Sequence, residues 1–236
     1  MLTDYGVRRG GFSLAEMMIA VMISGMVLAS LAAIHSTSTT HLFQNYRQNK
    51  LKNEATVAMK TVMSRLSTAT RIDWPAAGSA ANALSIAENV DHLPTRCYPI
   101  RAGEPVRWHY FCRYTTINSF CRSGRCLMYH TGTIAGGPGC PNTAAAPAIP
   151  YPAFCGPGGG GTVTRLMDHL DVSGGPVFSR RNADGIFERS SVLVRLHLLW
   201  TPSTAAAGDM SRIARPVDST LESVGSIQCS PGSDGC

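Results

Sequence analysis

Residues 12–34 read FSLAEMMIAVMISGMVLASLAAI, a run of 23 residues in which Glu16 carries the only formal charge. A helix of this length covers about 34 Å, which exceeds the ~30 Å hydrocarbon core of a bilayer. Arg8 and Arg9 precede the run, and basic residues in such a position stay on the cytoplasmic side of a membrane. The sequence therefore predicts a membrane-spanning helix with the following chain outside the cytoplasm.

Glu16 is unfavourable inside a bilayer unless it has a partner. A lone charge near the centre of a membrane helix costs at least ~2.5 kcal/mol. Cleavage between Gly11 and Phe12 would create a free α-amine four residues before Glu16, and such an ammonium group can neutralise a carboxylate in hydrocarbon. Two alternatives are a Glu16 that lies in the headgroup zone and a conventional secretory signal cut after Ala29. The secretory signal is disfavoured because its apolar stretch is only ~7–15 residues long.

The residues around Gly11 resemble the class III signal of the type IV pilin-like family, which comprises type IV pilins, minor pilins and type II secretion pseudopilins. The matching residues are Arg9-Gly10-Gly11 and the following FSLAEMMIA. The resemblance implies that residues 1–11 are a leader removed by prepilin peptidase and that the amine of Phe12 is N-methylated. It also implies that Glu16 pairs with the first residue of a neighbouring pilin, and that the subunit moves from the inner membrane into a pilus or pseudopilus.

The apolar pattern beyond the membrane segment 12–34 predicts that the helix continues. Apolar residues recur there every three or four positions, which makes one stripe along a helix. One helix from about Phe12 to Ala69 is possible, with residues 35–74 as its amphipathic part and Trp74-Pro75 as its end. Ser36–Thr40 consists of poor helix formers and is expected to be an aqueous joint beside the membrane. The stripe consists of Leu51, Ala55, Ala58, Met59, Val62, Met63, Leu66 and Ala69.

Residues 75–236 are predicted to form a globular head built on strands. The chain has 44% hydrophobic and 15% charged residues, which excludes a disordered protein. Apolar and polar residues alternate in 106–114 and 192–200, as is typical of strands. Residues 126–131 are expected to return as a hairpin partner of the first strand, and Asn182–Gly185 to form a turn before the second. The predicted fold class is α+β, with the second half of a long N-terminal helix packed on an antiparallel sheet, which is also the layout of pilins.

All eight cysteines lie after residue 96, and an even number in one region favours disulfides formed outside a reducing cytosol. Cys229 and Cys236 flank the turn-prone SPGSDG and resemble the C-terminal disulfide loop of type IV pilins. A bridge between Cys140 and Cys155 would brace the Gly/Pro-rich loop at 131–161. Zinc binding by Cys112, Cys121, Cys126 and His130 is the less favoured alternative, and no metal is expected. The pairing is left open for Cys97, Cys112, Cys121, Cys126, Cys140 and Cys155.

Residues 96–125 combine arginines with aromatic residues in a chain whose formal net charge is +6. This composition is typical of surfaces that bind single-stranded nucleic acid. The alternative, which we favour, is that strand alternation turns the aromatic residues inward and the arginines toward solvent. The candidate DNA-binding residues are Arg96, Arg101, Arg107, Arg113, Arg122 and Arg125.

The sequence contains no enzymatic motif in a suitable context. Gly156–Gly161 matches G-x-G-x-x-G, but the strand and helix of a dinucleotide-binding unit do not flank it. Asp168, Asp171 and Asp184 would bind calcium only if their loops converged, and solvated carboxylates are the favoured interpretation. We therefore expect a subunit that is not an enzyme and has no cofactor.

The expected function is that of a minor pilin or pseudopilin that initiates filament assembly at the tip. The first proline is Pro75, whereas many major pilins carry one within the apolar helix. Several cysteines and long loops also suit a low-copy subunit. Residues 192–200, 212–216 and 219–227 resemble the late strands of PilW-type minor pilins and PulJ-type pseudopilins. The alternative is a filament-tip binding module, either a DNA receptor or an adhesin, that uses residues 96–125.

Overall fold

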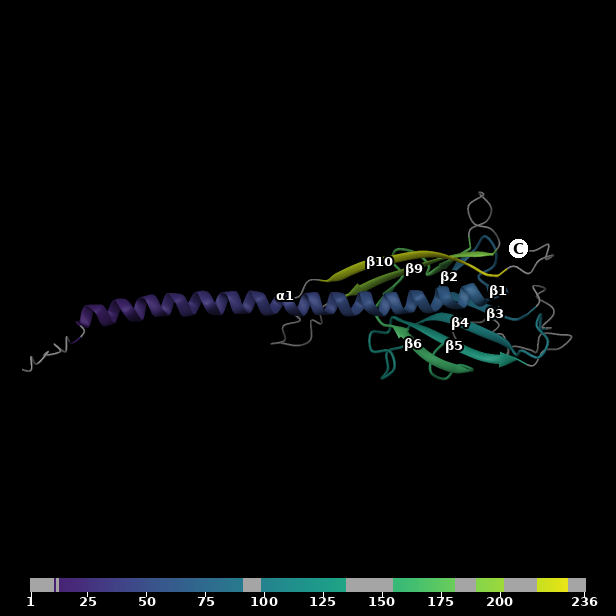
Figure 1. The fold of residues 1–236 in the computed structure, drawn as a ribbon, viewed down its shortest axis with the longest axis horizontal. Helices are drawn as coiled ribbons and strands as arrows, with labels where there is room; N and C mark the ends of the chain where they lie inside the picture. The colour runs from purple at the N-terminus through teal and green to yellow at the C-terminus, as the bar shows by residue number, and fades with distance from the viewer. Residues whose placement is uncertain are drawn as a thin grey trace, which may run out of the picture.

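The computed structural model of the protein describes residue 11 and residues 13–90, 99–134, 155–180, 190–201 and 216–228. One helix, α1 (Leu14–Thr68), runs out of a head made of antiparallel strands. Figure 1 shows that the first half of α1 projects from the head and that its second half lies between two layers of strands. The α+β fold class predicted from the sequence is confirmed.

The helix α1 is continuous for 55 residues, about 82 Å by its rise. The stretch Ser36–Thr40 is helical, and its threonine hydroxyl groups donate to carbonyl oxygens one turn earlier, as Thr37 does to Ala33 at 3.0 Å. The helix ends at Thr68, where the Ala69 N–H still bonds to the last turn. The predicted continuation of the helix to Trp74 is wrong, because residues 71–74 form a strand instead.

The first sheet explains this early helix end. The strand β1 (Arg71–Trp74) pairs antiparallel with β3 (Ala83–Glu88), so the backbone groups after Thr70 bond to a neighbouring strand rather than to a helical turn. Next to β3 lie β4 (Val106–Tyr114) and β5 (Cys126–Ile134), which confirms the predicted hairpin. The order is completed by β6 (Thr162–Met167) at the edge.

A second antiparallel sheet forms the other layer of the head, whereas the sequence predicted one sheet. Its long strands are β9 (Ser191–Trp200) and β10 (Val217–Ser226), which pair over their full lengths. The short strands β8 (Phe178–Ser179) and β2 (Ala80–Ala81) follow in the order β10-β9-β8-β2, and β7 (Leu170–Asp171) also pairs with β9. The predicted turn at Asn182–Gly185 lies outside the described residues.

The main core lies where α1 meets both sheets. The helix contacts β10 and β9 of the second sheet and β6 of the first (Figure 1). The predicted apolar stripe forms this contact, since Leu51, Ala55, Ala58, Val62 and Leu66 are all buried. Small alanine side chains in the middle of the stripe let the strands approach the helix closely. The second half of the helix is therefore part of the head.

A second apolar cluster lies on the other face of the first sheet. Trp108, Tyr110 and Cys112 of β4 belong to this cluster, whereas Phe111 belongs to the main core. The strand β4 is therefore buried on both faces over most of its length, and even His109 is only 2% exposed. Simple alternation along β4 did not indicate this double burial, because the second face is covered by loops that are distant in sequence.

Candidate functional site

The amino-terminal half of α1 is the first candidate functional region. Residues 13–38 are all exposed, and this part of the helix is rich in Leu, Ile, Met and Val. Among the described residues, α1 is the one helix that is long and apolar enough to cross a membrane. Such a large uncovered apolar surface requires a lipid or protein environment.

Glu16 helps to cap the amino-terminal end of this helix. The Ser13 N–H donates to Glu16 Oε2 at 2.8 Å, and the Glu16 N–H donates to Ser13 Oγ at 3.2 Å. This reciprocal arrangement is a capping box, which satisfies two backbone donors at a helix start. The spacing Ser13-x-x-Glu16 is the sequence signature of a capping box. The sequence-based assignment of Glu16 to assembly alone therefore missed its capping role. Gly11 is exposed, and Phe12 lies outside the described residues.

Two disulfides are present among the described residues. They join Cys112 to Cys155 and Cys121 to Cys126, and no free cysteine occurs in the described part of the chain. Cys155 is therefore bonded to the strand β4 and not to Cys140. The predicted pair Cys229–Cys236 stays a prediction, because both residues lie outside the described part of the chain, as do Cys97 and Cys140.

The four residues considered for zinc binding do not form one site but fall into two separate groups. Cys112, Cys155 and His130 lie together, and Cys121, Cys126 and Asp168 form the second group. In both groups the sulfur atoms are joined in a disulfide, whereas zinc is bound by thiolates. His130 has another role: its Nε2 accepts from the Gly156 N–H at 3.3 Å, its Nδ1 faces the Gly160 carbonyl oxygen, and burial lowers its pKa. A neutral His130 thus holds the Gly-rich loop against β5.

The Gly-rich segment 156–161 covers the second apolar cluster. A Cβ atom on Gly161 would overlap the Thr131 carbonyl oxygen and the ring of Trp108, and one on Gly156 would overlap the ring of Tyr114. Both glycines also have positive φ angles, which favour glycine. These glycines are explained by close packing on aromatic rings.

The candidate DNA-binding arginines do not form one cluster. Arg107 and Arg113 lie at opposite ends of β4, about 20 Å apart along the strand, and Arg122 and Arg125 lie in the connection after Arg113. Arg101 is near Arg107, where it pairs with Glu104 at 3.5 Å, and Arg125 pairs with Asp171 at 3.6 Å. Arg96 lies outside the described residues.

The aromatic residues between these arginines are mostly unavailable for stacking on bases. Trp108, Tyr110 and Phe111 are each at most 2% exposed, and Tyr114 is partly covered by the Gly-rich loop. Tyr98 lies outside the described residues. For the described part of β4, the structure therefore matches the favoured expectation that the aromatic side chains turn inward.

The acidic residues considered for calcium have other partners. Asp168 accepts hydrogen bonds from the Ser123 hydroxyl and from the His169 N–H. Asp171 lies beside Arg125 and His197, and the hydroxyl and N–H of Ser173 bond to it. These contacts, with the Ser173 hydroxyl as the largest, lower the pKa of Asp171. Asp184 lies outside the described residues.

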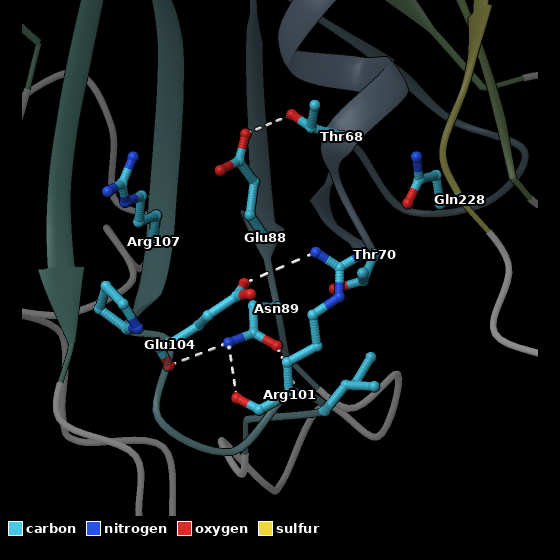
Figure 2. Close-up of a pocket in the computed structure, with 10 residues that line it drawn as sticks. Thr68, Thr70, Glu88, Asn89, Arg101, Glu104, Arg107 and Gln228 are labelled. Carbon is cyan, nitrogen blue, oxygen red and sulfur yellow. Dashed lines mark hydrogen bonds and ion pairs between the residues drawn. The ribbon is translucent and has the colours of Figure 1, made fainter.

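A pocket lies at the end of the head that is farthest from the exposed, apolar half of α1. It has a volume of about 530 Å³ and lies where α1 ends. Figure 2 shows side chains from the end of α1, from β3, from the loop before β4 and from the end of β10 around it. Sequence reasoning missed this pocket, because no motif joins four segments that are so far apart in the chain. We call it the distal pocket; its lining is Thr68, Thr70, Glu88, Asn89, Ile100, Arg101, Glu104, Pro105, Arg107 and Gln228.

Glu88 is an acidic group in the wall of the distal pocket. It accepts a hydrogen bond from Thr68, and its Oε1 lies 3.0 Å from His109 Nε2 and 4.0 Å from Arg65. Burial raises the pKa of Glu88, but the contacts with His109, Thr68 and Arg65 outweigh burial and lower the pKa to about 2. His109 in turn contacts the Tyr129 hydroxyl at 2.7 Å. The carboxylate of Glu88 therefore ties the end of α1 to the first sheet.

Comparison with known proteins identifies the amino-terminal segment. Residues 7–32 match the family model described as the prokaryotic N-terminal methylation motif. No curated protein and no solved structure matches the chain. The matched residues include Gly11 and Glu16, and the motif is the signal of type IV pilin-like proteins. The chain thus combines a class III signal of the type IV pilin kind with one long apolar helix and a disulfide-bonded β head, the features of a type IV pilin-like structural subunit.

Proposed function

We propose that this protein is a minor pilin or pseudopilin. Prepilin peptidase removes residues 1–11, the new amine of Phe12 is N-methylated, and α1 holds the subunit in the inner membrane with the head outside the cytoplasm. The subunit then enters a type IV pilus or a type II secretion-like filament. The observation that carries this proposal is a methylation motif at the start of a helix whose first half is uncovered and apolar and whose second half is buried in the head.

The division of α1 supports assembly through the helix. Its exposed half begins at Ser13, and its buried stripe begins at Leu51, close to the point where Arg47 stacks on Trp200 at 4.6 Å. The head therefore fixes only the second half of the helix. The exposed half is left to pack first against lipid and then against the same helices of neighbouring pilins.

A place at the filament tip is supported by the head. The described part of the head contains a second sheet, two disulfides and the distal pocket. The pocket is lined by Thr68 at the carboxyl-terminal end of α1, and this end lies opposite the apolar half that projects from the head (Figure 1). A tip subunit has no subunit beyond it, so this end of the head stays accessible. We therefore place the protein at the start of the filament, where it initiates assembly.

The DNA-receptor alternative has less support among the described residues. Base stacking needs exposed aromatic rings, whereas Trp108, Tyr110 and Phe111 are buried. The arginines on either side of them are separated by the length of β4.

Processing and assembly are tested together in a host that carries prepilin peptidase. We expect intact-mass measurement to show that the mature chain begins at Phe12 and carries one added methyl group. The variant Glu16→Gln keeps the size of the side chain but removes its charge, so it should be cleaved normally and should lose most of its incorporation into filaments. The measurement is the amount of subunit in sheared filaments relative to membranes.

The matched control is Glu54→Gln, because Glu54 lies on the same helix beyond the apolar half. This variant should assemble like the wild type. A mature chain that begins at Ser30, or equal incorporation of the Glu16→Gln variant and the wild type, would contradict the proposed function.

A further inference from the structure

We propose that the distal pocket binds a neutral saccharide of one or two rings. This proposal goes beyond filament assembly, because it assigns a ligand to the end of the head that faces away from the membrane. A pocket of about 530 Å³ lies within the ~300–1,000 Å³ range of small-molecule sites.

The loop that closes one side of the distal pocket is held in a defined conformation. The Asn89 side-chain amide donates to the Arg101 and Glu104 carbonyl oxygens at 3.3 and 3.0 Å, and its oxygen accepts from the Arg101 N–H at 2.7 Å (Figure 2). Asn89 itself has a φ of 56°, a conformation that asparagine tolerates better than most residues. Three hydrogen bonds from one buried side chain thus shape the wall of the pocket before any ligand arrives.

The charges around the distal pocket balance. Arg101 and Arg107 contribute two positive charges, and Glu88 and Glu104 contribute two negative charges. A polyanion such as DNA needs a surplus of positive charge, and this lining does not offer one. A ligand that is neutral and that both donates and accepts hydrogen bonds fits the lining better.

Sugar hydroxyl groups have this chemistry, because each one donates to a carboxylate and accepts from a guanidinium or an amide. Within the described part of the chain, the Arg107 guanidinium and the Gln228 side-chain amide have no hydrogen-bond partner and line opposite sides of the pocket (Figure 2). Glu88 is kept ionised by Thr68 and His109, so one strong acceptor is fixed in place.

The rim of the distal pocket also offers apolar surface. Ile100 is 46% exposed, and both Ile100 and Pro105 line the pocket. The C–H face of a sugar ring packs on surfaces of this kind while its hydroxyls point toward polar groups. The size, the charge balance and this mixed lining together favour a neutral saccharide over an anion.

The location of the distal pocket agrees with a ligand outside the cell. The pocket lies where α1 ends, about 80 Å along the helix from Leu14. A subunit at the filament tip would present it toward the surroundings.

The test uses the full-length mature protein in a detergent without a sugar headgroup, such as dodecylphosphocholine. Saturation-transfer NMR and titration calorimetry are run with four neutral disaccharides: lactose, maltose, cellobiose and N,N′-diacetylchitobiose. A heparin disaccharide and a 12-nucleotide oligothymidylate serve as anionic probes. We expect at least one neutral disaccharide to bind and both anions to bind no better than their charge predicts.

Three variants locate the binding. Arg107→Gln and Glu104→Gln should each weaken binding of that disaccharide about tenfold, as expected for the loss of one hydrogen bond to a charged group. Arg122→Gln removes an exposed arginine at the other end of β4 and should change nothing. All three variants should fold, because Glu104, Arg107 and Arg122 are exposed and belong to neither apolar cluster. Thermal unfolding followed by circular dichroism checks this.

Three results would overturn the proposal: no binding of any neutral disaccharide, binding that the Arg107 and Glu104 variants leave unchanged, or Arg107-dependent binding of the anionic probes alone. The last result would favour the DNA-receptor function. Arg107→Gln is expected to enter filaments normally, so failure of saccharide binding and failure of assembly are distinguishable.

Discussion

At the scale of single residues, Glu16 has one partner in the structure, Ser13, and a second one in the proposed filament. In the isolated subunit, the Ser13 N–H already bonds to its carboxylate at 2.8 Å. Pairing with the amine of a neighbouring subunit would exchange this neutral donor for a charged one. Because charge-assisted hydrogen bonds are roughly twice as strong as neutral ones, the exchange favours assembly while leaving the monomer tolerable in the membrane.

Glu88 gives a prediction at the same scale. Its pKa is about 2 in the folded protein against 4.5 for an unperturbed group, so the ionised form is bound more tightly in the fold. The resulting stability is fully present above about pH 4.5 and is lost as the pH falls toward 2. Glu88→Gln should lower the free energy of unfolding at pH 7 by roughly 1–3 kcal/mol and should flatten its pH dependence between pH 4.5 and 2.

Urea unfolding of the wild type and the variant at several pH values measures this effect. Glu104→Gln is the control, since Glu104 is exposed at the rim of the same pocket. A Glu88 variant that keeps the acid dependence of the wild type would show that this carboxylate does not hold α1 to the first sheet.

At the scale of elements, small residues allow the Gly-rich loop and α1 to pack closely on their neighbours. The Gly-rich loop lies on Trp108 because its glycines have no side chains, and the Cys112–Cys155 disulfide fixes its start to β4. The strands of the head pack closely on α1 for the same reason, because the buried stripe of the helix contains small alanine side chains.

The loop contact predicts the effect of a single methyl group. Gly161→Ala would overlap the Thr131 carbonyl oxygen and force a positive φ on alanine, so it should destabilise the head by about 1–3 kcal/mol. Gly158→Ala in the same loop has open space at its Cβ and should have almost no effect. Thermal unfolding measures both variants. Equal stability of the two would mean that the loop does not pack on Trp108.

At the scale of the whole molecule, the helix divides the protein into an apolar anchor and a globular head (Figure 1). The head carries disulfides, which form outside a reducing cytosol. The anchor and the disulfides both agree with the proposed topology, in which the membrane lies between the cytoplasm and the head.

This topology predicts the redox state of the purified protein. Alkylation without reduction should leave Cys112, Cys121, Cys126 and Cys155 unlabelled, and alkylation after reduction should label all four. Peptide mass spectrometry measures both, and elemental analysis should find no stoichiometric zinc. Free thiols that only a chelator exposes to the reagent would instead support metal binding and a reducing compartment.

The sequence by itself determined the features that depend on neighbouring residues. The apolar run at 12–34, the helical stripe from Leu51 to Leu66 and the alternation at 106–114 are local periodicities, and the structure confirms the helix and the hairpin that they predict. The capping box at Ser13 and Glu16 is equally local and was readable. Local periodicity succeeds here because it reports which side of an element is apolar.

Only the tertiary structure decided the features that depend on distant residues. The helix ends at Thr68 because β3 offers hydrogen bonds to the chain after it, and the cysteine pairs depend on which strands and loops meet. The arginines of residues 96–125 share a region of sequence but are separated by the length of β4. The distal pocket needs four segments to converge, and Glu88 owes its lowered pKa to Thr68 and His109 from two other elements. No local sequence pattern indicates these tertiary contacts, because they follow from packing between elements far apart in sequence.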